Sequence, residues 1–172
     1  MYMNRLLSLT NQISLADLFV PMPILIVPAG FSYVVASLFS TVFLLTGQTI
    51  TVSKNRRLAG IEYPRLYADK AETAASPAAM KFNCAQRAHQ NTLENIPTVY
   101  LMTTILGLKH PVLAAAALGS WVVSRVAYTV GYASGNPAQR NNLVGRITYV
   151  PAILTLILGS GYTVFQLLTE GL

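Results

Sequence analysis

Two long stretches without a charged residue constrain what this chain can fold into. No charged side chain occurs between Leu18 and Ser53, and none occurs from Ile147 to Thr169. A helix needs about 20 consecutive apolar residues to cross a bilayer, and the run that follows Pro28 meets that length. Only 10% of the residues are charged, whereas soluble domains average about 25%. The sequence therefore predicts an all-α integral membrane protein.

Prolines and polar residues set the expected helix boundaries. Pro28 precedes the first span, and Ser76 with Pro77 supplies an N-cap and a first-turn proline for the second. Pro97 is expected to kink that second span. We expect a single transmembrane domain over residues 1–172, with an interfacial leader at 1–28 and four spans at about 29–52, 77–108, 111–134 and 144–169.

The basic connections indicate how these spans are oriented. The segment from Lys54 to Lys81 is rich in Lys and Arg and is predicted to be a loop, and Arg140 and Arg146 follow the third span. Because short basic loops accumulate on the cytosolic side of a membrane, both connections are predicted to face the cytosol. The tight turn at 109–111 makes the second and third helices antiparallel neighbours and places both termini on the lumenal side.

The second predicted span carries a polar face. At about 100° per residue, Asn91 lies about 40° and Glu94 about 20° from Arg87, so the three side chains share one side of a helix. An ionisable residue in a hydrophobic span costs about 2.5–3.5 kcal/mol on insertion scales, and it is expected to face protein or a wet cavity. This face is a candidate binding site. The alternative is an internal Arg87–Glu94 ion pair that only holds neighbouring helices together.

The third predicted span carries a second polar face. Tyr128 lies about 60° and Tyr132 about 20° from Arg125, so one side of this helix offers a cation and two phenols. Arginine binds carboxylates with two parallel hydrogen bonds, which suits a small polyanionic ligand. The alternative is an interfacial tyrosine belt with an arginine that extends to the water.

Composition excludes several other classes. The net charge of +6 is spread between apolar segments and is not interleaved with aromatic residues as on a nucleic-acid surface, so we expect no nucleic-acid partner. The sequence contains no metal-ligand cluster, and its single cysteine, Cys84, is expected to be a packed thiol. No internal repeat is present, which argues against a small channel or transporter.

Three sequence motifs resemble those of the membrane-associated proteins in eicosanoid and glutathione metabolism. The motifs are VSKNRR before IEYPRLY, FNCAQRAHQNTLENIP, and WVVSRVAYTVGYASGNPAQR, which span roughly Val52 to Arg140. The similarity is greatest to the microsomal glutathione S-transferase 3 branch of this family. The resemblance implies a homotrimer of four-helix subunits in the endoplasmic reticulum or another intracellular membrane. It also implies that glutathione, the co-substrate, binds between adjacent subunits near the cytosolic face.

The resemblance also assigns site residues, position by position. Arg140 resembles the family arginine that stabilises the glutathione thiolate, and Arg146 is the alternative for that role. His89 stands where leukotriene-C synthases carry a glutamine contact, and Asn95 where they carry a tyrosine. The residues that resemble glutathione contacts are Arg87, His89, Asn91, Glu94, Arg125, Tyr128 and Tyr132.

The function implied is glutathione transfer to hydrophobic electrophiles, together with glutathione-dependent reduction of lipid hydroperoxides. The lipophilic substrate would arrive from the membrane lipids and glutathione from the cytosol. The alternative is a non-catalytic, lipid-presenting scaffold that resembles the lipoxygenase-activating protein of the same family.

Overall fold

The computed structural model describes residues 27–170, and within them the chain is helical without a strand. The all-α prediction is therefore confirmed, whereas nearly all of the predicted leader at 1–28 lies outside the described residues. The elements are the helices α2 (Phe31–Ala59), α3 (Lys70–Ala75), α4 (Pro77–Gly107), α5 (Pro111–Tyr132) and α6 (Leu143–Glu170), with the 3-10 helix η1 (Pro137–Asn141) between α5 and α6.

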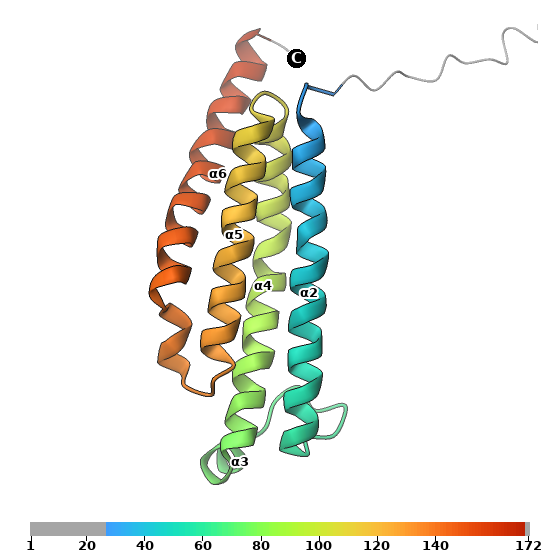
Figure 1. Ribbon diagram of the computed structural model, residues 1–172, viewed down its shortest axis with the longest axis vertical. Helices are drawn as coiled ribbons and strands as arrows, with labels where there is room; N and C mark the ends of the chain where they lie inside the picture. Colours follow the sequence, from blue (N-terminus) through green and yellow to red (C-terminus); the bar gives the residue numbers. More distant parts are fainter. Residues whose placement is uncertain (1–26, 171–172) are drawn as a thin grey trace, which may run out of the picture.

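The four long helices lie side by side and alternate in direction (Figure 1). Helices α4 and α5 pack against each other and against both α2 and α6. The α2–α4 connection with α3 and the α5–α6 connection with η1 lie at one end of the molecule, which we call the basic end (Figure 1). The short α4–α5 turn lies at the other end, which we call the turn end. Alternation thus brings the second half of α2 and of α5 beside the first half of α4 and of α6.

The prediction of a loop from Lys54 to Lys81 is wrong in two places. Helix α2 extends into its first residues, and α3 and the start of α4 occupy its last ones. Helix α2 continues to Ala59, because nothing between Val52 and Ala59 interrupts it and basic residues in its last turn favour the helix dipole. It ends at Gly60, which adopts a left-handed conformation with φ 66°. Helix α3 then forms because the Asp69 side chain accepts from the Glu72 amide while the Glu72 side chain accepts from the Asp69 amide.

The start of α4 follows the expected chemistry. The Ser76 side chain accepts from the Ala79 amide at 3.4 Å, and Pro77 occupies the first helical position. Pro97 lies inside the helix, where it removes one backbone donor.

Three of the long helices, α2, α5 and α6, are long and apolar enough to cross a membrane. They also expose large apolar side chains such as Phe43, Val130 and Leu158, which water would not tolerate over so wide a surface. The protein is therefore an integral membrane protein. Helix α4 is not in this group of candidate spans, so a fourth crossing stays a prediction.

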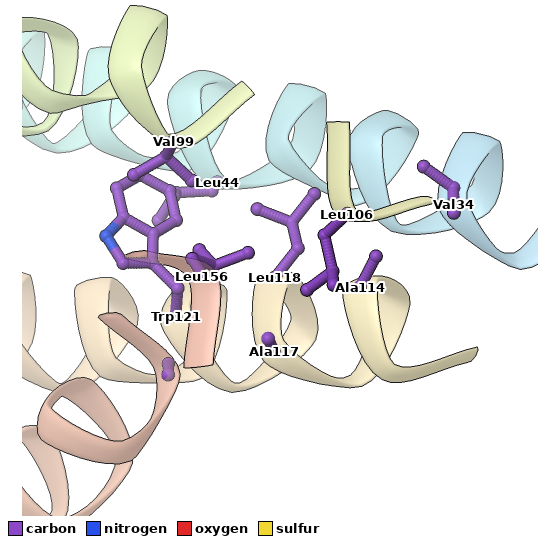
Figure 2. Packing of buried hydrophobic residues seen from close by; sticks show 10 residues of the cluster. Val34, Leu44, Val99, Leu106, Ala114, Ala117, Leu118, Trp121 and Leu156 are labelled. Atoms are coloured by element: carbon purple, nitrogen blue, oxygen red, sulfur yellow. The ribbon is translucent and has the colours of Figure 1, made fainter. Parts of the chain in front are cut away.

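An apolar core holds the turn-end half of the helices together. Trp121 of α5 packs with Leu44 of α2 and Val99 of α4, and Leu118 packs with Leu156 of α6 in the same cluster (Figure 2). This core fixes the relative positions of α2, α4, α5 and α6. Those positions determine which polar side chains meet at the basic end.

Candidate functional site

Arg125 is the centre of the polar contacts near the basic end. It is only 5% exposed although it is charged. Its Nε donates to Thr92 Oγ1 at 3.2 Å, and its Nη2 donates to Asn91 Oδ1 at 2.8 Å. One edge of the guanidinium is thereby bound to two consecutive residues of α4. The alternative of an arginine that extends to the water is therefore wrong for Arg125.

A row of stacked side chains runs from Arg125 to η1. The Arg125 Cζ lies 4.1 Å from the centre of the Tyr128 ring, which meets the Tyr132 ring edge to face at 5.5 Å. The Arg140 Cζ lies 5.7 Å from the centre of the Tyr132 ring. The predicted polar face of the third span, Arg125, Tyr128 and Tyr132, thus forms one continuous row with Arg140.

A cavity of about 200 Å³ opens beside this row, between α5, η1 and α6. Its lining includes three arginines, Arg125, Arg140 and Arg146, and two tyrosines, Tyr128 and Tyr149. Arg125 Nη1 makes no hydrogen bond within the described part of the chain and is not among its buried unpartnered atoms. The cavity therefore presents positive charge to a ligand.

The packing of η1 on α5 places Arg140 at this cavity. Gly131 permits the approach, because a Cβ at this position would overlap the Gln139 carbonyl oxygen. Asn142 holds the segment from both sides: its Nδ2 donates to the Ala127 carbonyl oxygen at 2.7 Å, and its Oδ1 accepts from the Gly145 amide at 2.8 Å. The second of these contacts caps the first turn of α6. Gly131 and the Asn142 side chain thus fix the position of η1 and, with it, of Arg140.

The Arg87–Glu94 ion pair, which was the alternative interpretation of the polar face of the second span, is present. Arg87 Nη1 lies 2.7 Å from Glu94 Oε1, and the two side chains are 42% and 47% exposed. Both residues belong to α4 and half of each side chain is open, so the pair does not hold two helices of this chain together. The ion pair of the alternative is therefore present, and within the described residues it links two positions of one helix.

Among the described residues, one hydrogen bond joins the two polar faces. Asn91 contacts Arg125, whereas Arg87 and Glu94 contact each other. Among the described residues no hydrogen bond links His89 to either group. Asn95 turns back onto its own helix, with Nδ2 donating to the Asn91 carbonyl oxygen at 2.7 Å.

Tyr67, which the sequence analysis did not single out, reaches α4 from the connection before α3. Asn83 holds this connection through two hydrogen bonds with the backbone of Ala68, at 2.8 and 2.9 Å. The Tyr67 hydroxyl donates to Gln90 Oε1. Burial raises the pKa of Tyr67 above 10.0, an effect that the positive charge of Arg87 opposes, so the hydroxyl is a neutral donor near pH 7. This contact was not predicted, because the segment from Lys54 to Lys81 was interpreted as a loop without further structure.

Gln48 is the second residue that sequence reasoning missed. This α2 side chain is 2% exposed, and its Nε2 donates to Thr92 Oγ1 at 2.8 Å and to Thr129 Oγ1 at 2.7 Å. A signal was available, because Gln48 is the one carboxamide in the run from Ala29 to Val52. A polar amide in a membrane span is expected to face protein rather than lipid.

The apolar helices and the buried arginine beside the cavity define the class of protein: an all-α membrane protein with a cationic site. The sequence model of the MAPEG family matches residues 34–161, and the chain belongs to that family. The matched region contains Gln48, the two polar faces, η1 and the cavity. The family includes glutathione transferases, leukotriene synthases and proteins like the lipoxygenase-activating protein.

Proposed function

We propose that this protein is a membrane-bound glutathione transferase with glutathione-dependent peroxidase activity, of the microsomal glutathione S-transferase 3 type. The observation that supports it most is Arg125, a buried arginine that lines a cavity together with Arg140 and Arg146. Glutathione carries two carboxylates, and fixed guanidinium groups bind carboxylates with charge-assisted hydrogen bonds. Tyr128 and Tyr132 would serve its amide groups.

The exposed Arg87–Glu94 pair suits the rest of the same ligand. The Glu94 carboxylate can accept from the glutathione ammonium, and Arg87 can bind the carboxylate beside it. Asn91 and His89 would complete the contacts on α4. Because Asn91 meets Arg125 within one chain while Arg87 and Glu94 stay half exposed, we propose that this exposed pair faces an adjacent subunit in a homotrimer.

Arg140 is the proposed catalytic residue, with Arg146 as the alternative. A cation beside the sulfur stabilises the thiolate, which is the nucleophile. In conjugation the thiolate forms a sulfur–carbon bond with the electrophile. With an epoxide the carbon–oxygen bond breaks and the alkoxide takes up a proton, and with an aryl halide the carbon–halogen bond breaks and the halide leaves. In peroxide reduction it attacks the terminal oxygen of a lipid hydroperoxide, the O–O bond breaks and the lipid alcohol leaves. A second glutathione then reduces the sulfenic acid, which yields glutathione disulfide and water.

The location proposed is the endoplasmic reticulum or another intracellular membrane, with the basic end facing the cytosol. Glutathione would enter from the water at this end. The lipophilic substrate would diffuse along the exposed apolar faces of α2, α5 and α6.

The decisive test is glutathione binding and turnover by purified protein in detergent. Turnover would be compared for a lipid hydroperoxide, a conjugated epoxide and an aryl halide, and binding measured by calorimetry. Arg125→Ala should weaken glutathione binding roughly tenfold to a hundredfold, since hydrogen bonds to charged groups contribute about 1.5–3 kcal/mol. Lys109→Ala, which removes a cation at the turn end, is the matched control and should leave binding unchanged.

The lipid-presenting scaffold is the second candidate, supported by the wide apolar surface that α2, α5 and α6 expose. It predicts that the wild type binds a lipophilic ligand but turns over none of the three substrates. Turnover that disappears in Arg125→Ala and persists in Lys109→Ala would exclude the scaffold.

A further inference from the structure

A buried hydrogen-bonded cluster connects α2, α4 and α5 beside the cavity. It consists of Gln48, Thr92, Arg125 and Thr129, and none of these side chains is more than 8% exposed. Gln48 binds both threonines, and each threonine binds Arg125: Thr92 through the guanidinium Nε, Thr129 through the backbone carbonyl. The three bonds between side chains measure 3.2 Å or less, and the bond from Thr129 to the Arg125 carbonyl oxygen measures 2.7 Å.

We propose that Gln48 is a positioning residue that sets the orientation of Arg125 toward the ligand. The proposal rests on the proposed function, because it assigns a role toward the same glutathione site. Gln48 itself does not contact the reacting atoms. It acts through the Thr92 hydroxyl, which accepts from Arg125 Nε, while its second hydrogen bond, to Thr129 Oγ1, fixes the Gln48 amide against α5.

The contacts of the two threonine hydroxyls give the hydrogen bonds of the cluster a direction. Thr92 Oγ1 donates to the Ala88 carbonyl oxygen at 3.1 Å, and Thr129 Oγ1 donates to the Arg125 carbonyl oxygen at 2.7 Å. A hydroxyl has a single hydrogen, so toward Gln48 both threonines can only accept. In this arrangement the amide nitrogen of Gln48 faces both threonines.

This arrangement leaves Gln48 Oε1 buried and without a donor among the described residues. An unpartnered buried acceptor lowers stability, and an apolar side chain of similar size would avoid the penalty. Both threonines already satisfy themselves on their own helix carbonyls. Helix packing alone therefore does not explain the glutamine, whereas fixing the hydroxyl that accepts from Arg125 Nε does.

The consequence for Arg125 is a single orientation. Thr92 and Asn91 occupy the edge formed by Nε and Nη2, and the Tyr128 ring covers one face at 4.1 Å. What remains is the end that carries Nη1, and Arg125 is one of the residues that line the cavity. A receptor group held in this way loses little conformational freedom when it binds a carboxylate.

The test compares Gln48→Met, which keeps the volume and removes the donors, with Tyr100→Phe. Tyr100 hydrogen-bonds Thr41 of α2 from α4, so the control removes another α2–α4 hydrogen bond away from Arg125. Gln48→Met should raise the Kd and KM for glutathione about tenfold, with little change in kcat and no loss of thermal stability. Tyr100→Phe should leave both constants at the wild-type values.

A double-mutant cycle separates positioning from general packing. If Gln48 acts through Arg125, adding Gln48→Met to Arg125→Ala should cause no further loss of affinity. Equal losses in both backgrounds, or wild-type affinity in Gln48→Met, would overturn the proposal. If Gln48→Met does not fold, Gln48→Asn is used in its place, because it retracts the donors by one methylene and should weaken binding in the same way. Absence of glutathione binding by the wild type would instead refute the proposed function, and this inference with it.

Discussion

The four long helices bury different kinds of side chain toward the turn end and beside the candidate site near the basic end. At the turn end Leu106, Leu118 and Trp121 fill the space between helices and are fully buried. At the basic end the corresponding space holds Gln48 and Arg125 with their threonine partners. Polar groups in a membrane protein interior need partners, and their positions must be exact to within a hydrogen bond. The comparison indicates that the candidate site lies toward the basic end, where a second apolar cluster that includes Val52 and Phe82 packs α2 against α4.

The connections differ in the same way. The turn end joins α4 to α5 through a few residues without further structure. At the basic end Arg56 is 7% exposed, its Nη1 donates to the Arg65 carbonyl oxygen at 2.6 Å, and its guanidinium lies between the rings of Tyr63 and Phe82. The arginine that appeared in the sequence to mark a cytosolic loop is thus a structural residue that fastens the connection to α4.

Trp121→Ala should break the turn end and spare the basic end, with the largest effect on stability. Removing a buried aromatic side chain costs about 3 kcal/mol or more through lost packing. Unfolding in detergent, followed by circular dichroism, would measure the loss. The glutathione affinity of the molecules that remain folded should be unchanged, and a matching loss of affinity would mean that the two ends are not separable.

Arg140→Ala should have the opposite profile, with turnover reduced tenfold or more and stability near the wild-type value. A thiol with a pKa of about 8.5 is only a few per cent ionised at pH 7, and lowering that pKa by about two units makes most of it reactive. Losing the cation raises the thiol pKa, so the rate should rise at higher pH than in the wild type. Arg146→Ala is the matched variant at the same cavity. If it, and not Arg140→Ala, shifts the pH–rate profile, the thiolate role belongs to Arg146.

The positions of the helices could largely be predicted because proline, glycine and charge-free runs act locally. Ser76 and Pro77 begin α4 where the sequence indicates, and Gly135 and Pro137 separate α5 from η1. The α2 boundary was wrong because basic residues were interpreted as loop residues, although a last helical turn accommodates them well.

The site could be predicted only within each helix. The 100° periodicity placed Arg125, Tyr128 and Tyr132 on one face, and the structure stacks them there. It could not show that Thr92 and Thr129 would meet Gln48, because that depends on how three helices pack. Tyr67 was missed for a similar reason, since an Asn83 contact to the chain backbone decides where it lies.

The smallest expected effect is a local loss of stability at acid pH, in the connection that contains α3. Hydrogen bonds from Arg65 and from the Asp69 backbone amide lower the pKa of Glu72 below 4.5. A carboxyl whose pKa is lower in the folded state contributes stability above its unfolded pKa and loses it as the pH falls through the folded value. Both partners of Glu72 lie near the water, so the effect is confined to α3.

Hydrogen exchange corrected for intrinsic rates should show the amides of Glu72 and Thr73 losing protection below pH 4.5, while the His110 amide at the turn end keeps it. Glu72→Gln keeps the size of the side chain and removes its titration, so its α3 amides should exchange faster at pH 6 and show no further loss on acidification. A persistent acid effect in that variant would show that other groups of the basic end, and not the Glu72 carboxylate, make the two ends differ in their response to pH.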